Sequence, residues 1–412
     1  MVWTLAVAAL FFHLSNPLTM VPFFGDSLHR SIIVAVGATV LTLPWLRLPR
    51  LPWAVLPAIA LMYASLGWTI SWDVTWGVSQ VYVKVALVAW LCTWSTDARS
   101  LTHGLHLGGV VVVVTSVYAF WAGLPFADVP ADATGFLAGV GANRNILGYT
   151  LVLAWAAALA HVPHGRVARP AWTLGVATIA LGLFLAQSAT AFVVAALVAG
   201  LALALARRDP LSVRLGTHRP LVLAAGGGAA ALAALLATGV LLGRDVASLS
   251  GRTQIWAAIW DATYGQRLLG QGWGTTWPHA WVQAPPNPVF EYVNANYGAG
   301  VVAHGHASLM DVMPDLGFAG MAAFALAHVV VAVLGVHRWW RTPSETARRD
   351  PTGRLVLLVL LGLVAYGATE PLATTPLGWF LLVVLAGLAG RPTCADDEAG
   401  RSLAARPRHV QR

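Results

Sequence analysis

Residues 171–206 read AWTLGVATIALGLFLAQSATAFVVAALVAGLALALA, thirty-six residues without one charged side chain. A helix crosses the hydrocarbon core of a bilayer with about 20 apolar residues, at about 1.5 Å per residue, so this stretch is too long for one span. The polar run Gln187-Ser188-Ala189-Thr190 suits a tight turn. The stretch therefore predicts two spans, 171–188 and 189–206. Without that turn there is one span fewer, and the two chain ends lie on opposite sides.

The composition of the whole chain agrees with a membrane protein. Of 412 residues, 58% are hydrophobic and only 10% are charged, whereas soluble domains carry about 25% charged residues. This composition excludes an ordinary soluble domain. The two cysteines, Cys92 in an apolar run and Cys394 in the polar tail, predict no disulfide.

The same length criterion predicts an all-α, polytopic transmembrane bundle of about 12 spans. Residues 2–15 have no preceding Lys or Arg and no convincing cleavage site, so they read as a retained helix rather than a signal peptide. The spans are expected near 2–22, 31–47, 53–72, 76–95, 101–123, 145–163, 171–188, 189–206, 220–242, 308–336, 354–369 and 376–391.

Arginines alternate between the loops of this layout. Short cytoplasmic loops carry an excess of Lys and Arg, which sets the orientation. The arginine-bearing loops and tail hold Arg47, Arg50, Arg99, Arg166, Arg169, Arg207, Arg208, Arg214, Arg219, Arg338, Arg341, Arg348, Arg349, Arg354, Arg391, Arg401, Arg406, Arg408 and Arg412, and the alternate short loops hold Asp73, Asp128, Asp132 and Glu370. We therefore expect both termini in the cytoplasm. The net charge of +8 is then a topology signal that favours anionic membrane lipid and requires no nucleic acid.

One external loop, residues 243–307, is far longer than the others. It is rich in Trp, Tyr and Phe, which argues against disorder, and long loops are usually functional. From Arg252 to Tyr264 the apolar spacing is helical, so we expect short amphipathic helices lying at the membrane surface. The expected organisation is N-terminal spans in 1–140, a core in 141–336 that includes this loop, C-terminal spans in 337–391 and a cytoplasmic tail in 392–412.

Three cations stand where cations are unusual. Arg252 and Arg144 lie on the predicted outer side, where either could face lipid headgroups or bind phosphate. Lys84, the only lysine in the chain, lies within a span. A cation inside the membrane is a candidate functional residue, and snorkelling or pairing within the bundle is the alternative.

The long loop also contains closely spaced glycines and a pair of histidines. Gly270, Gly272 and Gly274 alternate, which permits positive φ and close backbone approach, and no phosphate-binding fingerprint surrounds them. His304 and His306 close the loop at the start of the tenth span. Histidines there could be general bases, metal ligands or plain surface residues. No recognisable zinc pattern accompanies them, so we expect no metal and no other cofactor.

An ordered set of motifs resembles the O-antigen ligase family. It comprises Gly251-Arg252, Leu269-Gly270-Gln271-Gly272-Trp273-Gly274, His306-Ala307 followed by Gly317 and Gly320, and the Asn143-Arg144-Asn145 entry to the sixth span. The resemblance is strongest over residues 140–330. Two departures are evident. Ala307 replaces the usual Asn, Ser or Gln, and Ala189 follows Ser188 at a position where family members often carry a basic residue.

The resemblance implies a metal-independent, inverting glycan transferase in the bacterial cytoplasmic (inner) membrane, with an external active site. The donor would be a glycan on undecaprenyl diphosphate, and the acceptor a hydroxyl of a glycan, lipid or protein. His306 would be the catalytic base, and Arg252 and Arg144 would bind the diphosphate. His304, Arg267, Arg244 and Lys84 are possible accessory residues. A polysaccharide-chain polymerase with the same site is the alternative, and a secondary transporter is a further one, although no convincing internal repeat is present.

Overall fold

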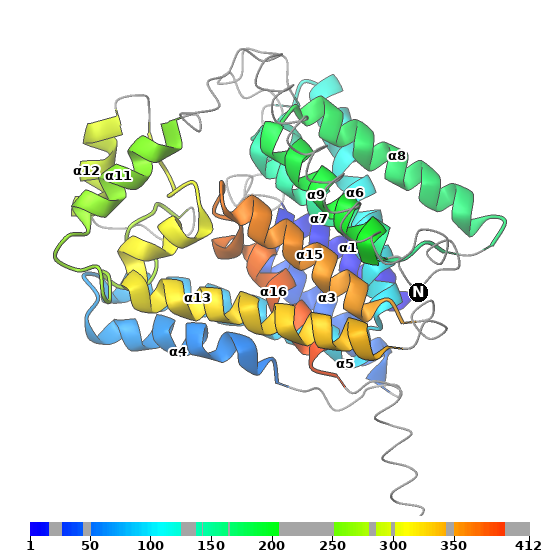
Figure 1. The fold of residues 1–412 in the computed structure, drawn as a ribbon, viewed down its shortest axis with the longest axis horizontal. Coiled ribbons are helices and arrows are strands. Elements are labelled where there is room, and N and C mark those ends of the chain that lie inside the picture. Colours follow the sequence, from blue (N-terminus) through cyan, green and yellow to red (C-terminus); the bar gives the residue numbers. More distant parts are fainter. Residues whose placement is uncertain are drawn as a thin grey trace, which may run out of the picture.

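The structure, a computed structural model, describes residues 1–15, 27–43, 51–124, 137–141, 143–163, 165–205, 251–279, 286–297, 301–342 and 350–391. Throughout these ranges the chain is built from helices and contains no β-strand (Figure 1). The all-α prediction is thereby confirmed for the described residues.

Most of the longer helices overlap the predicted spans, and α11 and α12 lie in the long loop. They are α1 (Val2–Ser15), α3 (Ser27–Leu41), α4 (Leu56–Ala64), α5 (Trp72–Ser95), α6 (Ala98–Trp121), α7 (Arg144–Ala160), α8 (Ala168–Ala186), α9 (Ala189–Leu205), α11 (Arg252–Ala262), α12 (Pro288–Tyr297), α13 (Ser308–Arg341), α15 (Thr352–Gly367) and α16 (Pro376–Ala389). Short 3-10 turns are η3 (Trp53–Val55), η4 (Ser65–Gly67), η5 (Gly139–Gly141) and η9 (Leu372–Thr374). The predicted span at 220–242 lies outside the described residues.

The predicted break in the 171–206 stretch is confirmed. Helix α8 ends at Ala186, Gln187 adopts the left-handed conformation with φ of 47°, and α9 begins at Ala189. A left-handed residue after the last turn is a common way for a helix to end. The turn between the two helices therefore presents Ser188, which is almost fully buried, to the interior of the bundle.

The chain is a multi-pass membrane protein by the length and apolar character of its helices. Among the described residues, four helices are long and apolar enough to cross a membrane, namely Trp72–Trp94, Ala98–Trp121, Ala168–Ala186 and Ser308–Arg341. Further apolar helices of 10–17 residues accompany them. The count of about 12 spans and the orientation remain predictions, because length and composition alone do not place a helix across a bilayer.

Helix α16 occupies the centre of the bundle. Every residue from Leu377 to Ala389 is buried, as expected for a helix that is apolar all round. It packs against α5, α15 and α13 (Figure 1). Thr375 caps its first turn by accepting a hydrogen bond from the Gly378 amide at 3.1 Å. Helix α16 therefore places the loop that precedes it, residues 368–375, against the ends of its neighbours.

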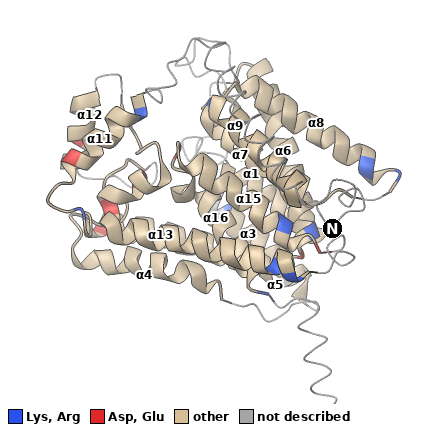
Figure 2. Ribbon diagram, viewed as in Figure 1, with Lys and Arg blue, Asp and Glu red and all other residues tan. Residues whose placement is uncertain are grey.

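The two ends of the bundle differ in charge. Figure 2 shows several Lys and Arg residues at the ends of α8 and α13 that lie far from α11 and α12, and it shows both acidic and basic residues near α11 and the opposite end of α13. At the far end of α13, Arg338 pairs with Asp350 at 2.9 Å and donates to the Arg391 carbonyl at 2.7 Å. These two contacts anchor the arginine-rich end of α13 to the segment before α15 and to the end of α16.

The described part of the long loop 243–307 folds into a small lobe of its own. Helices α11 and α12 pack together, and Ile255, Ile259, Val289 and Val293 form a separate buried cluster with their neighbours. Helix α11 covers Arg252 to Ala262, close to the predicted range. The isoleucine face of α11 points into the lobe, where it packs against α12.

The glycines of this lobe dock it onto α13. Helix α13 contains Pro314 and is kinked at Gly317, where φ is 60° and ψ is −158°. The Phe318 amide donates to the Arg267 carbonyl at 2.7 Å, and the Gly272 amide donates to the Asp315 carbonyl at 2.9 Å. Gly270, Gly272 and Gly274 all have positive φ. The alternating glycines and Gly317 therefore let the backbone of the lobe approach the backbone of α13 closely, as the glycine spacing predicted.

Replacing Gly317 with alanine is expected to lower the thermal stability of the purified protein. A Cβ there would collide with the backbone of Arg267 and Leu268, and a non-glycine residue in this backbone region costs about 1–3 kcal/mol before that clash is counted. The measurement is the Tm in detergent. Gly265→Ala is the matched control, because its Cβ would meet no atom within 4 Å. An equal Tm for both variants would contradict the packing role.

Candidate functional site

A buried ion pair joins the lobe to the bundle. Arg252, the first residue of α11, donates from Nη2 to Oε1 of Glu370 at 2.6 Å and from Nε to the Thr369 carbonyl at 2.9 Å. The two side chains are only 12% and 5% exposed. Burial raises the pKa of Glu370, and the Arg252 guanidinium offsets part of that rise. The guanidinium is therefore held in one orientation by an acid and a carbonyl.

Side chains from two bundle helices and one turn support Glu370 from the other side. Asn145, in the first turn of α7, donates to Glu370 Oε1 at 2.9 Å. The hydroxyl of Ser188 donates to Asn145 Oδ1 at 3.0 Å and lies 3.1 Å from the hydroxyl of Tyr366, which donates to the Asn145 carbonyl at 3.0 Å. This network connects the α8–α9 turn, α7 and α15 to a single carboxylate.

His306 faces the same carboxylate. Its Nδ1 lies 3.8 Å from Glu370 Oε2, and its side chain is 28% exposed. The backbone of His306 is left-handed, with φ of 49°, which is uncommon for a residue other than glycine. Two hydrogen bonds to its neighbour Gly305 hold the turn: the Gly305 amide donates to Asp311 Oδ1 at 2.8 Å, and Trp256 Nε1 donates to the Gly305 carbonyl at 2.9 Å.

The turn is also tied to the loop that carries Glu370. Ser308, the first residue of α13, donates to the Glu370 carbonyl at 3.3 Å and accepts from the Ala373 amide at 3.0 Å. Strained backbone that the surroundings hold in place is typical of functional sites. The turn fixes His306 between the lobe and the bundle.

His304 and His306 are neighbours in space. Their ring centroids are 4.1 Å apart, and the His306 amide donates to His304 Nδ1 at 3.3 Å. Burial and then the Arg252 charge lower the pKa of His306 to about 4. Burial, then His306 and Arg252, lower the pKa of His304 to about 3. Both imidazoles are therefore neutral near pH 7, which is the form that accepts a proton or binds a metal.

The two histidines and Glu370 also form a possible metal-ligand set. Their ligand atoms all lie within 4.8 Å of one another, and the sequence pattern had predicted no metal. Two neutral imidazoles and a carboxylate are chemically suitable ligands for zinc. The Arg252 guanidinium, 2.6 Å from the same carboxylate, competes for Glu370 and adds a positive charge beside the site.

The other candidate residues from the sequence occupy different parts of the structure. Arg144 begins α7, beside Asn145, and is partly exposed. Arg267 stacks on the Trp260 ring at 3.9 Å and donates to the Trp260 carbonyl at 2.8 Å, so it packs on the surface of the lobe. Lys84 is exposed on α5, in keeping with snorkelling. Arg244 lies outside the described residues.

Several members of the cluster are not predicted as site residues by the sequence. Glu370 stands out there only as an acidic residue of a short loop, and Tyr366 does not stand out at all. Asn145 belongs to a motif that carries the family resemblance, and Ser188 belongs to the predicted turn, but neither is linked to Glu370 by the sequence. The sequence feature that could have identified Glu370 is its place as an acid in a short predicted outer loop between two spans, because a lone carboxylate at a membrane boundary needs a partner.

The helices and the cluster define a multi-pass membrane protein with a buried Arg–Glu pair and two histidines where a folded loop meets the bundle. The chain matches no known protein-family model. It is 28% identical over 319 residues to the exopolysaccharide production protein ExoQ of Rhizobium meliloti (strain 1021), covering 74% of this chain and 69% of that protein. This likeness supports a distant relationship between the two.

Proposed function

We propose that this protein takes part in exopolysaccharide production as a glycan transferase of the O-antigen ligase type. The observation that carries the proposal is the meeting of Arg252, Glu370 and His306, which places a cation and a neutral base side by side. The likeness to ExoQ supports the polysaccharide part of the proposal, and the ordered motifs support the reaction type. The donor is a glycan on a polyprenyl diphosphate such as undecaprenyl diphosphate, and the acceptor is a hydroxyl group.

In the proposed reaction, His306 accepts the proton of the acceptor hydroxyl. The oxygen attacks the anomeric carbon of the donor sugar as the bond to the diphosphate oxygen breaks, so the configuration at that carbon inverts. The proton remains on His306, and Glu370, 3.8 Å from Nδ1, stabilises the imidazolium. The diphosphate leaves with the electron pair of the broken bond. A carboxylate that orients and stabilises an imidazolium is a common arrangement for a catalytic histidine.

Arg252 stabilises the charge that develops on the leaving diphosphate, with Arg144 as a second cation. An arginine matches phosphate oxygens with a planar fork of donors. Because Thr369 and Glu370 already hold the Arg252 guanidinium, little reorganisation is needed when the donor binds. The reaction as proposed uses no metal, since arginine carries the stabilising charge.

A chain polymerase is the second candidate. The observation in its favour is the likeness to a protein of exopolysaccharide production, a process in which chains must grow. The acceptor would then be the sugar end of a second lipid-linked glycan, and the same cluster would serve.

The test is a transfer assay in proteoliposomes with a labelled polyprenyl-diphosphate oligosaccharide. Transfer of label to an added acceptor supports a ligase, and longer lipid-linked chains support a polymerase. Label that crosses the bilayer without forming a new glycosidic bond would overturn the proposed function in favour of transport.

The pH dependence of transfer should reflect the lowered pKa of His306. Because the base must be neutral and its pKa is about 4, activity should be nearly constant from pH 5.5 to 7.5 and should fall as pH drops through about 4. Arg252→Gln should move the midpoint upward, since one of the two causes of the lowered pKa is removed. Initial rates from pH 3.5 to 8 measure this. A wild-type midpoint near 6.5, the ordinary value for histidine, would contradict a buried base.

We also propose that the lobe and the cluster face the outside of the bacterial inner membrane, with both termini in the cytoplasm. Val301 in the long loop is 81% exposed, and Val167 in an arginine-bearing loop is 83% exposed. Cysteines at these positions, in a chain whose Cys92 and Cys394 are serine, should react with a membrane-impermeant thiol reagent from opposite sides. Reaction of both from the same side would reverse or abolish the proposed orientation.

A further inference from the structure

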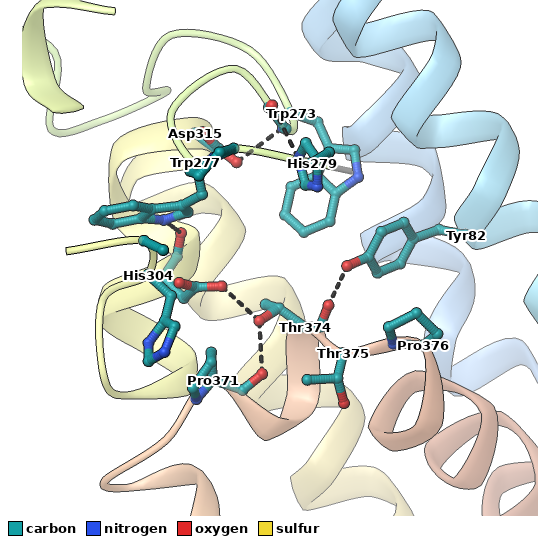
Figure 3. A pocket seen from close by; sticks show the side chains of 14 residues that line it. Tyr82, Trp273, Trp277, His279, His304, Asp315, Pro371, Thr374, Thr375 and Pro376 are labelled. Atoms are coloured by element: carbon teal, nitrogen blue, oxygen red, sulfur yellow. Dashed lines mark hydrogen bonds between the residues drawn. The ribbon is translucent and has the colours of Figure 1, made fainter. Parts of the chain in front are cut away.

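A cavity of about 170 Å³ lies next to the histidine pair and has no part in the reaction described above. Figure 3 shows Trp277 and His304 on one side of it and Tyr82 and Pro376 on the other, with Thr374 and Thr375 between them. The loop 273–279, the start of α13 and the segment 371–376 supply its walls. It therefore lies where the lobe, the bundle and the candidate catalytic turn meet.

The walls combine aromatic rings with hydrogen-bonding groups. Trp273, Trp277 and Tyr82 line the cavity together with Asp311 and Asp315. The side chains are held firmly: Trp277 Nε1 donates to the Asp311 carbonyl at 3.0 Å, and the Gly274 and Thr276 amides donate to the Asp315 carboxylate at 2.8 and 3.0 Å. A rigid wall of aromatic and other apolar groups with a few fixed polar groups is the usual construction of a small-ligand site.

One wall residue has an unsatisfied polar atom. Trp273 is 3% exposed, and its indole nitrogen has no hydrogen-bond partner in the described part of the chain. Buried indole N–H groups usually find an acceptor, and leaving a buried donor unpaired costs free energy. The nitrogen itself is enclosed by protein, so Trp273 offers the cavity its aromatic ring rather than a hydrogen-bond donor.

The chemistry of the walls selects a neutral, hydroxyl-bearing occupant. None of the cavity's lining residues is Lys or Arg, and two are carboxylic acids, so the cavity offers no arginine or lysine to bind a diphosphate. A sugar ring instead offers apolar C–H faces to aromatic rings and hydroxyl groups to carboxylate and carbonyl oxygens. At about 170 Å³ the cavity is smaller than the roughly 300–1,000 Å³ of pockets for drug-sized ligands, which favours one ring over an oligosaccharide.

The position of the cavity relates it to the acceptor. His304 lines it, with its ring centroid 4.1 Å from that of His306, and Pro371, the residue after Glu370, lines it as well. Arg252, the proposed ligand of the donor diphosphate, is not among the lining residues. A ring held in this cavity would therefore lie beside the proposed base and apart from the phosphate-binding cation.

We propose that this cavity binds one pyranose ring of the acceptor, so that the acceptor is a glycan rather than a protein side chain or a simple lipid. The identification of this ring as part of the acceptor rests on the proposed function. Its physical content, a site for a neutral sugar ring walled by Trp273 and Trp277, can be tested by binding alone.

The experiment measures binding of methyl glycosides of glucose, galactose and mannose to the full-length protein in detergent, by saturation-transfer NMR. Ala303 is exposed at the cavity wall, and Ala303→Phe should fill the cavity without removing a hydrogen bond. We expect at least one glycoside to bind the wild type and Ala303→Phe to weaken it by about ten-fold or more, the equivalent of one lost hydrogen bond or stacking contact. Val301→Phe introduces the same side chain at an 81% exposed position and should bind normally.

Two further measurements keep the result interpretable. Trp273→Phe keeps an aromatic wall and removes the indole N–H, so it should weaken binding less than Ala303→Phe does. Inorganic pyrophosphate, the probe for Arg252, should bind Ala303→Phe as it binds the wild type, which also verifies folding. The inference is wrong if none of the glycosides binds the wild type or if Ala303→Phe binds them equally well. Absence of transfer in the proteoliposome assay, with glycoside binding intact, would overturn the proposed function and leave the sugar site standing.

Discussion

Replacing His306 with alanine is expected to lower the rate of glycan transfer by about 10²–10⁴-fold, the usual contribution of a general base. The structure supports this expectation because His306 is the histidine that faces Glu370, at 3.8 Å from Nδ1 to Oε2. Donor binding should survive, since Arg252 does not depend on His306 for its position. The measurements are single-turnover transfer from the lipid-linked donor and direct binding of inorganic pyrophosphate.

Two other histidines serve as comparisons. His304→Ala should raise the KM for the acceptor and have a smaller effect on kcat, because His304 lines the sugar-sized cavity and its Nδ1 accepts from the His306 amide. His337→Ala removes an exposed histidine at the far end of α13 and should leave transfer unchanged. A His306→Ala enzyme that works as well as His337→Ala would remove His306 from the mechanism.

Chelation distinguishes the base from a metal ligand. His304, His306 and Glu370 could hold an ion by geometry, and loss of His306 would abolish activity in either case. The proposed mechanism expects chelator-treated, metal-free protein to keep full activity. Activity that is lost with chelator and restored by a divalent ion would instead assign the three residues to a metal centre.

Replacing Arg252 with alanine is expected to have the second large effect, on stability and on transfer together. Removing one partner of a buried ion pair costs about 3–5 kcal/mol because the remaining charge is left buried, and here Glu370 is only 5% exposed. Loss of a charge-assisted contact to the donor should lower transfer by a further ten- to a hundred-fold. Arg252→Lys should also be impaired, because a point charge cannot contact Thr369 and Glu370 with a planar fork.

A double-mutant cycle separates the two effects. Glu370→Gln keeps the shape of the side chain and removes its charge. In the variant that carries both Arg252→Ala and Glu370→Gln, no uncompensated charge is buried, so the Tm should recover relative to Arg252→Ala. Pyrophosphate binding should remain low if Arg252 binds the donor, and it is the deciding measurement because Glu370→Gln by itself lowers transfer by removing the carboxylate beside His306. Recovery of pyrophosphate binding in step with the Tm would show that the arginine serves only to neutralise Glu370.

Local features of the chain follow from short stretches of its sequence. The end of α8 at Ala186 and the start of α9 at Ala189 follow from the apolar length and the polar turn between them. The helix at 252–262 follows from the spacing of its isoleucines. The close backbone packing of Gly270 and Gly317 follows from the residue type, because only glycine lacks the Cβ that would collide there.

The partners of the candidate site residues do not follow from such local patterns. The sequence predicts Arg252 as a cation at the membrane surface, and the structure instead places it in a buried pair with Glu370, 118 residues away along the chain. Asn145 reaches the same carboxylate across 225 residues. Hydrophobic periodicity and charge alternation indicate which face of a helix is buried and which end is cytoplasmic. They do not indicate which loops meet.

Loop composition thus predicted that residues 243–307 carry a folded, functional segment, and motif spacing selected His306 over His304. The tertiary structure alone decided that Glu370 is the common partner of Arg252, Asn145 and His306, and that a sugar-sized cavity lies beside them. The physical reason is that helix formation and membrane insertion depend on residues within one or two turns, which a linear sequence displays. An ion pair and a cavity depend instead on how the central helix α16 and its neighbours pack, which juxtaposes residues hundreds of positions apart.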